Sequence, residues 1–240
     1  MSRRAALRAA AAALVLGGGL AGPGARADDA LAGLPALPAG GLRVYLVRHG
    51  QALSNLDPAP DLPPEQLDHL TPLGKQQAEA AGRALAGRGV SAVISSPASR
   101  ARETALAVAQ ALGLQAKAVE PRLQPMALGH AAGGRALTWK ERGAEWEAGR
   151  DTRPADGEAL GDVGDRVADC VRALARSRRG ASVVLVAHGE VIAAYLGRVR
   201  GTPAPKRYPF ALGFGSISVV DVGATGSETV RLANVVPAAP

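Results

Sequence analysis

The order of apolar and polar residues along the chain predicts strands and helices in alternation. The stretch LRVYLV (42–47) is typical of a strand, and VSAVISS (90–96) is a second short strand. Between them, apolar residues recur at helical spacing over 71–87. A second helix over 96–113 and a third strand around 114–119 follow. This half of the chain is therefore predicted to run β-α-β-α-β.

Capping residues support both of these helices. Thr71 is a candidate N-cap, and Ser96 is the candidate for the second helix; each is followed by a proline, which favours the first helical turn. Gly113 lies where the second helix would stop, because glycine readily adopts the left-handed conformation that ends many helices.

The second half of the chain begins with an irregular segment. Residues 121–157 are rich in Gly, Pro and charge, and they predict loops and short helices suited to covering a ligand. Beyond them the pattern predicts a helix over 158–177, an apolar strand in ASVVLVAHGE (181–190), a helix to about 198, and strands in GSISVVDV (215–222) and TVRLANVV (229–236). The alternation, with one near-continuous apolar strand, predicts an α/β fold with a largely parallel central sheet and helices on both faces.

The first 27 residues have the three parts of a secretory signal. A basic start is followed by an apolar stretch from Ala9 to Leu20 and by small residues ending at Ala27. We expect a signal peptide at 1–27, a linker rich in Ala, Pro and Gly at 28–41 and one domain at 42–240. The protein would be periplasmic or secreted, by the Sec route or, given the start MSRRAAL, by twin-arginine export.

The apolar stretch of this signal is short for a membrane-spanning helix, which needs about 20 apolar residues. No stable membrane insertion is therefore expected after cleavage, and an uncleaved anchor is the alternative. The formal net charge is +7, but four arginines and no acids lie in the first 27 residues. Removing those four charges leaves +3, which is too little to predict nucleic-acid binding.

Two predicted strands end in the same local pattern. Arg48 and His49 follow the first strand and His188 follows a later one, and a glycine comes directly after each histidine. In open α/β sheets, ligands bind beyond the carboxyl ends of the strands. Arg100, and with less weight Arg102, lies at the start of the helix after the strand at 90–96, where guanidinium groups and free N–H groups suit a phosphate. These residues predict a pocket for a dianion, centred on an imidazole nucleophile.

Five blocks in this order resemble the signatures of the histidine phosphatase superfamily, in its phosphoglycerate-mutase-like branch. They are LVRHGQALSN, LTPLGKQQA, SSPASRARETA, PADGEALGDVGDRV and VVLVAHGEVI. The resemblance covers about Leu42 to Val236. It implies that His49 becomes phosphohistidine, and that Arg48, Arg100 and His188 surround the phosphoryl group. It further implies no metal and no cofactor, and we expect Asn55, Gly50, Gln51 and Gly189 to contribute to substrate binding.

One family feature is absent from this sequence. The family takes a proton-donating glutamate from a segment like RLRE, but this chain has RLQPMALG, which places Pro125 at that position. Glu190, two residues after the second histidine, is an alternative acid, as in phytase-like relatives, and His130 is a weaker one. Alternatively, the substrate needs no acid, or the chain is a phosphate-ligand binding protein with weakened catalysis.

The remaining chemically active side chains have simpler interpretations. His69 is expected at the surface, Glu158 as a helix cap, and both tryptophans, Trp139 and Trp146, as packing residues. The single cysteine, Cys170, shares a helical stripe with valines and is expected in the core.

The resulting hypothesis is an exported, metal-independent phosphatase that hydrolyses a phosphate ester or anhydride through phosphohistidine. Its partner would be a phosphorylated small molecule or envelope component. A phosphomutase is the alternative within the family. The sequence names neither the substrate nor the oligomeric state.

Overall fold

The computed structural model describes residues 27–116, 118–208 and 210–238. A six-stranded sheet of order β3-β2-β4-β1-β5-β6 forms its centre. The strands are β1 (Leu42–Arg48), β2 (Val90–Ser95), β3 (Ala118–Val119), β4 (Ser182–Ala187), β5 (Ile217–Val222) and β6 (Glu228–Val235). The first four are mutually parallel, while β5 and β6 are antiparallel additions at one edge. The predicted α/β fold with a largely parallel sheet is therefore confirmed.

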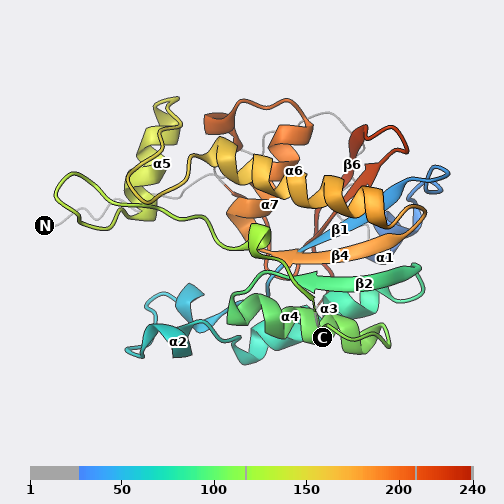
Figure 1. Ribbon diagram of the computed structural model, residues 1–240. Coiled ribbons are helices and arrows are strands. Elements are labelled where there is room, and N and C mark those ends of the chain that lie inside the picture. Colours follow the sequence, from blue (N-terminus) through green and yellow to red (C-terminus); the bar gives the residue numbers. More distant parts are fainter. Residues whose placement is uncertain (1–26, 117, 209, 239–240) are drawn as a thin grey trace, which may run out of the picture.

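Helices cover both faces of the sheet, as Figure 1 shows. The α-helices are α1 (Ala27–Ala32), α2 (Pro64–Leu67), α3 (Pro72–Leu85), α4 (Ser99–Ala111), α5 (Trp139–Glu147), α6 (Leu160–Ser177) and α7 (Gly189–Val199). Short 3-10 turns are η1 (Leu53–Asn55), η2 (Pro121–Leu123) and η3 (Ala204–Arg207). Helices α3 and α4 pack on one face and α6 and α7 on the other. None of the helices in the described ranges is long and apolar enough to cross a membrane.

Alternation along β1 divides the core into two layers. Val44 and Leu46 pack with α6 and α7, whereas Tyr45 and Val47 pack with α3 and α4. Cys170 on α6 belongs to the first layer and is 1% exposed, and its burial raises the pKa of the thiol to about 12. The expected core role of Cys170 is confirmed.

Two of the three predicted helix caps are present. The Thr71 side chain accepts a hydrogen bond from the Gly74 N–H at the start of α3, and Gly113 has a φ of 66° just after α4. The prediction for Ser96 is wrong. Pro97 and Ala98 complete the turn out of β2, so α4 begins at Ser99 with Ala98 in the N-cap position. Ser96 is left fully buried beneath the sheet edge.

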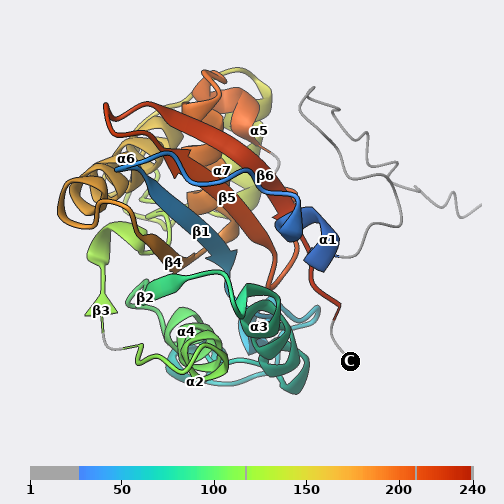
Figure 2. The ribbon, with the colours of Figure 1, turned by 90° about the vertical axis from the view of Figure 1, so that its right-hand side faces the viewer.

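The segment before β1 departs from the predicted linker. Residues 27–32 form α1, whose Leu31 is 1% exposed and packs into the core layer of α3 and α4. Figure 2 shows α1 beside α3 and β6. The Pro35 carbonyl also accepts a hydrogen bond from Arg43 at 2.7 Å. This segment is therefore packed on the domain, because Leu31 and Pro35 have partners there. The expected signal peptide falls on residues 1–26, outside the described chain, and on Ala27.

The irregular segment 121–157 contains η2, α5 and loops, as predicted. Figure 1 shows α5 and its flanking loops projecting from the layered body.

Candidate active site

The two strand-end histidines lie side by side. His49 follows β1 and His188 follows β4, and these strands are parallel neighbours with Arg48 opposite Ala187. Their carboxyl ends therefore meet at one edge of the sheet, where both imidazoles are nearly fully buried and their ring centroids are 5.1 Å apart. The structure thus brings together the two histidines that the sequence places at one edge of the sheet.

Hydrogen bonds determine the tautomer of His49. Its Nδ1 lies 2.7 Å from the Gly50 carbonyl oxygen, which only accepts, so Nδ1 carries the proton. The Nε–H of Arg100 donates to His49 Nε2 at 3.2 Å, so Nε2 holds the lone pair. Burial, Arg100 and Arg48 lower the pKa of His49 to about 3. The ring is therefore a neutral base at physiological pH, with its nucleophilic nitrogen facing a guanidinium.

Arg100, in the first turn of α4, joins the two histidines. Its Nη2 donates to His188 Nδ1 at 3.1 Å, so His188 carries its proton on Nε2 and donates it to the buried Ser96 Oγ at 2.8 Å. Burial, His49 and Arg100 hold the pKa of His188 well below its usual value. Ser96, expected to cap a helix, instead orients the second histidine.

Asp68, directly after α2, is a site residue that sequence analysis did not identify. Its Oδ1 accepts a hydrogen bond from Arg100 Nη1, and its Oδ2 accepts the Ser99 N–H at 2.6 Å. The carboxylate therefore holds both the start of α4 and the guanidinium. The neighbouring His69 pairs with Glu103, and its side chain is 55% exposed, which agrees with its expected surface position. Nothing in the pattern around PPEQLDHL distinguished Asp68 from an ordinary loop acid.

We expect Asp68→Asn to raise KM for a phosphate ester about tenfold with a smaller change in kcat. A charge-assisted hydrogen bond contributes about 1.5–3 kcal/mol, and its loss would let Arg100 leave its binding position. Steady-state kinetics measure both constants. Glu103→Gln is the matched control, because Glu103 bonds to His69 and the Leu70 N–H. Equal KM values for the Asp68 variant and the wild type would contradict the role.

Arg48 is held by the connection between η3 and β5. Its Nη1 donates to the Leu212 carbonyl, and its guanidinium lies 3.9 Å over the Phe214 ring. Its Nε is buried and has no hydrogen-bond partner among the described residues. A buried donor without a partner is costly unless a ligand satisfies it, so this nitrogen suits an oxyanion.

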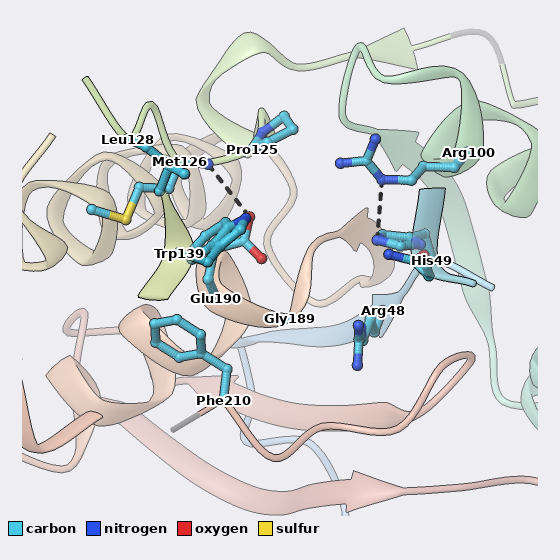
Figure 3. Close-up of a pocket in the computed structure, with 11 residues that line it drawn as sticks. Arg48, His49, Arg100, Pro125, Met126, Leu128, Trp139, Gly189, Glu190 and Phe210 are labelled. Carbon is cyan, nitrogen blue, oxygen red and sulfur yellow. Dashed lines mark hydrogen bonds between the residues drawn. The ribbon is translucent and has the colours of Figure 1, made fainter. Parts of the chain in front are cut away.

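A cavity of about 400 Å³ opens beside His49. The residues that line it are Arg48, His49, Asn55, Arg100, Pro125, Met126, Leu128, Trp139, Gly189, Glu190 and Phe210. In Figure 3 the two arginines and His49 lie at one end, and Met126, Leu128 and Phe210 at the other. Nothing in the described ranges forms a group of three or more His, Cys, Asp or Glu side chains placed to hold a metal ion.

Two of the four expected substrate-binding residues line this cavity. Asn55 and Gly189 do, and the Asn55 Oδ1 accepts the Ala52 N–H at 3.0 Å, so its Nδ2 group is the part able to donate to a ligand. Gly50 and Gln51 are not among the residues that line the cavity.

Gly50 and Gln51 connect the β1 end to the helices below it. The Gly50 N–H donates to Thr104 at 3.0 Å, and the Gln51 N–H donates to Gln77 at 2.9 Å. A Cβ at Gly50 would lie 2.2 Å from the Gly74 carbonyl oxygen. Gly50 thus permits a close approach of two backbone segments, and a contact of Gly50 or Gln51 with substrate stays a prediction.

Glu190 reaches the same cavity from the first turn of α7. Its Oε1 lies 3.4 Å from the Met126 N–H, next to Pro125. Burial raises the pKa of this carboxyl. A carboxyl group that keeps its proton to a higher pH than usual therefore lies beside the residue that occupies the family's acid position. His130, the weaker alternative, lies 3.6 Å from Asp156 and does not line the cavity.

Four further residues test the simpler interpretations. Arg102 is exposed, and Trp146 is 2% exposed, as expected for a solvated arginine and a packing tryptophan. Trp139 is different, because it is 45% exposed and lines the cavity. Glu158 does not cap α6, which has Ala159 in the N-cap position; it pairs with Arg166 at 2.7 Å.

Comparison with known proteins decides the family. Residues 44–235 match the family model described as histidine phosphatase superfamily (branch 1). The chain belongs to this superfamily. It is 34% identical over 199 residues to the glucosyl-3-phosphoglycerate phosphatase of Mycolicibacterium vanbaalenii, covering 75% of this chain and 83% of that protein. It is 28% identical over 187 residues to the "Probable phosphoglycerate mutase GpmB" of Serratia proteamaculans, covering 75% and 85%.

A solved structure supports the same assignment. The mycobacterial glucosyl-3-phosphoglycerate phosphatase in complex with VO3 has a TM-score of 0.63 and 28% identity, covering 80% of this chain and 98% of that chain. The resemblance inferred from the five sequence blocks is confirmed.

Proposed function

We propose that this histidine phosphatase hydrolyses a phosphate ester or anhydride through a phosphohistidine at His49, without a metal ion. One observation carries the proposal: the unprotonated Nε2 of His49 accepts a hydrogen bond from Arg100 at one end of a cavity that Arg48 also lines. Phosphoryl transfer requires a nucleophile and positive charge on the phosphoryl oxygens at the same place. Two arginines supply the charge that a metal ion supplies in other phosphatases.

In the first transfer, Nε2 of His49 attacks phosphorus as the bond to the leaving oxygen breaks. The phosphoryl oxygens take the place of Nε2 as acceptors for Arg100, and Arg48 lines the same cavity. The Nδ1–H bond to the Gly50 carbonyl stabilises the positive charge that the ring acquires. In the second transfer, water attacks phosphorus, and the N–P bond breaks to release phosphate.

We assign the protonation of the leaving oxygen to Glu190. Burial raises the pKa of this carboxyl, which favours the form that can give a proton to the leaving oxygen. The resulting carboxylate accepts a proton from the attacking water, which restores the starting state. The Met126 N–H holds the carboxyl at the cavity wall. A substrate with a good leaving group would depend little on proton donation by Glu190. Hydrolysis with and without a proton donor could therefore take place at the same site.

Phosphate release from p-nitrophenyl phosphate tests the proposal. We expect the same rate with and without EDTA, because the arginines, and no divalent metal, neutralise the phosphoryl oxygens. A phosphomutase, the activity in the name of the GpmB relative, would use the same phosphohistidine but return isomerised ester instead of free phosphate. A binding protein would release none. Loss of activity in EDTA that added metal restores would contradict the metal-independent mechanism.

We also propose that the protein is exported, either to the periplasm or to the medium. The basic, apolar and small-residue order of residues 1–27 supports export, and cell fractionation with N-terminal sequencing of the mature chain tests it.

A further inference from the structure

The cavity has two chemically different ends. Arg48, His49 and Arg100 form the end that receives the phosphoryl group. The opposite wall is formed by Met126, Leu128, Trp139 and Phe210, which we call the apolar wall, and Figure 3 shows most of it across the cavity from the arginines. An ester held by His49 would therefore direct its alcohol part toward apolar side chains.

An aromatic cluster supports this wall from behind. The Trp139 and Phe210 rings meet edge to face with centroids 6.2 Å apart, and the buried Trp146 lies 5.6 Å from Phe210 and 5.4 Å from Tyr208. The chain has only two Trp, three Tyr and two Phe residues. Four of these seven gather here, from α5 and from the connection after η3. The wall is thus a packed surface and not a chance exposure of one side chain.

The charges near the apolar wall disfavour a second anion on the substrate. Glu190 is the ionisable side chain there among the described lining residues. Arg166, beneath the same segment, bonds to Glu158 and to the carbonyl oxygens of Arg122 and Gln124. A substrate carboxylate next to the phosphate ester would therefore lose its hydration without gaining an ion pair with a cationic side chain, and this desolvation costs binding free energy.

We propose that the substrate's alcohol part is an uncharged, ring-bearing group that packs against Trp139 and Phe210. This inference rests on the proposed phosphatase function, since it assumes that the phosphoryl group lies at His49. An aromatic ring and the CH face of a sugar ring share the chemistry that such a wall recognises.

Turnover of four esters with alkyl leaving groups separates these chemistries. We expect kcat/KM to be highest for benzyl phosphate and glucose 6-phosphate, lower for glycerol 1-phosphate and lowest for 3-phosphoglycerate. Trp139→Ala should lower kcat/KM about tenfold for the ring esters that the wild type prefers, because about 1.4 kcal/mol of ring packing is lost, and should lower it much less for glycerol 1-phosphate. Trp139→Phe should restore most of the kcat/KM for the ring esters. Leu106→Ala, which truncates an exposed residue on α4, should leave kcat/KM unchanged for all four esters.

A binding measurement keeps the inference independent of turnover. By calorimetry, benzylphosphonate should bind more tightly than phosphonoacetate, and Trp139→Ala should remove the difference. Equal or tighter binding of phosphonoacetate would overturn the inference even if the enzyme is an active phosphatase. Conversely, absence of turnover with all four esters and with p-nitrophenyl phosphate, together with Trp139-dependent binding of benzylphosphonate, would overturn the proposed function and leave the ring site standing.

Discussion

Replacing His49 with alanine is expected to reduce phosphate release by about 10⁴-fold or more, because the covalent route is lost when its nucleophile is removed. The arginines remain, so the variant should still bind phosphate esters. When turnover of a labelled ester is stopped by denaturing the protein at alkaline pH, where phosphohistidine survives, the wild-type protein should carry the label and His49→Ala should carry none. Rates and labelling are measured with p-nitrophenyl phosphate and its ³²P form.

His130→Ala is the matched control for this variant. His130 is a partly exposed histidine outside the cavity, so both its rate and its labelling should equal those of the wild type. A His49→Ala protein that turns over at the wild-type rate would exclude phosphohistidine at this position. Activity lost in His130→Ala would return that residue to consideration as the acid.

The second large effect is expected for Glu190→Gln. A positioned general acid contributes about 10²- to 10⁴-fold, and most when the leaving group is a poor one. We therefore expect hydrolysis of alkyl phosphates to fall by about that factor and hydrolysis of p-nitrophenyl phosphate to change little. Glutamine preserves the acceptor for the Met126 N–H, so a loss confined to alkyl esters reports the proton and not the shape of the cavity.

The dependence of activity on pH gives an independent readout. Glu190 must be protonated to act, and burial raises its pKa, so alkyl-ester activity should decline as pH rises through that raised value. This limb should be absent in Glu190→Gln. His49 adds no acid limb near pH 6 to 7, because its pKa is lowered to about 3.

Glu158→Gln controls for support of the same segment. Glu158 accepts the Ala127 N–H at 3.0 Å, one residue from the Glu190 contact, but it pairs with Arg166 and does not line the cavity. Its loss should lower stability and affect alkyl and aryl esters alike. If the two glutamine variants behave the same way, Glu190 is a support and not the acid.

The phosphate end of the site was predictable from sequence for a physical reason. His49 and His188 each follow a strand, and parallel neighbouring strands bring their carboxyl ends to one edge, so strand order and motif together place them. Arg100 was predictable because it lies at the start of the helix that follows another parallel strand, β2. These residues are positioned by regular elements whose period is visible in the chain.

The rest of the site depends on loops, whose path leaves no period in the sequence. Asp68 reaches Arg100 because the turn after α2 folds back onto α4. Trp139 was expected to pack, and in part it does, but the loops around α5 leave it facing the cavity. Ser96 fits a helix-cap pattern equally well whether it caps or orients His188, and only the path of Pro97 and Ala98 distinguishes the two.

The short connection Phe210–Phe214 touches both halves of the cavity. Phe210 belongs to the apolar wall, while Leu212 and Phe214 hold Arg48, and the Phe214 ring centroid lies 5.9 Å from that of His49. The residue that would contact the alcohol part and the residues that hold Arg48 therefore lie on the same short backbone segment. Because this connection is only five residues long, a shift at its Phe210 end would also move its Phe214 end. Binding of the alcohol part and binding of the phosphoryl group would therefore be coupled.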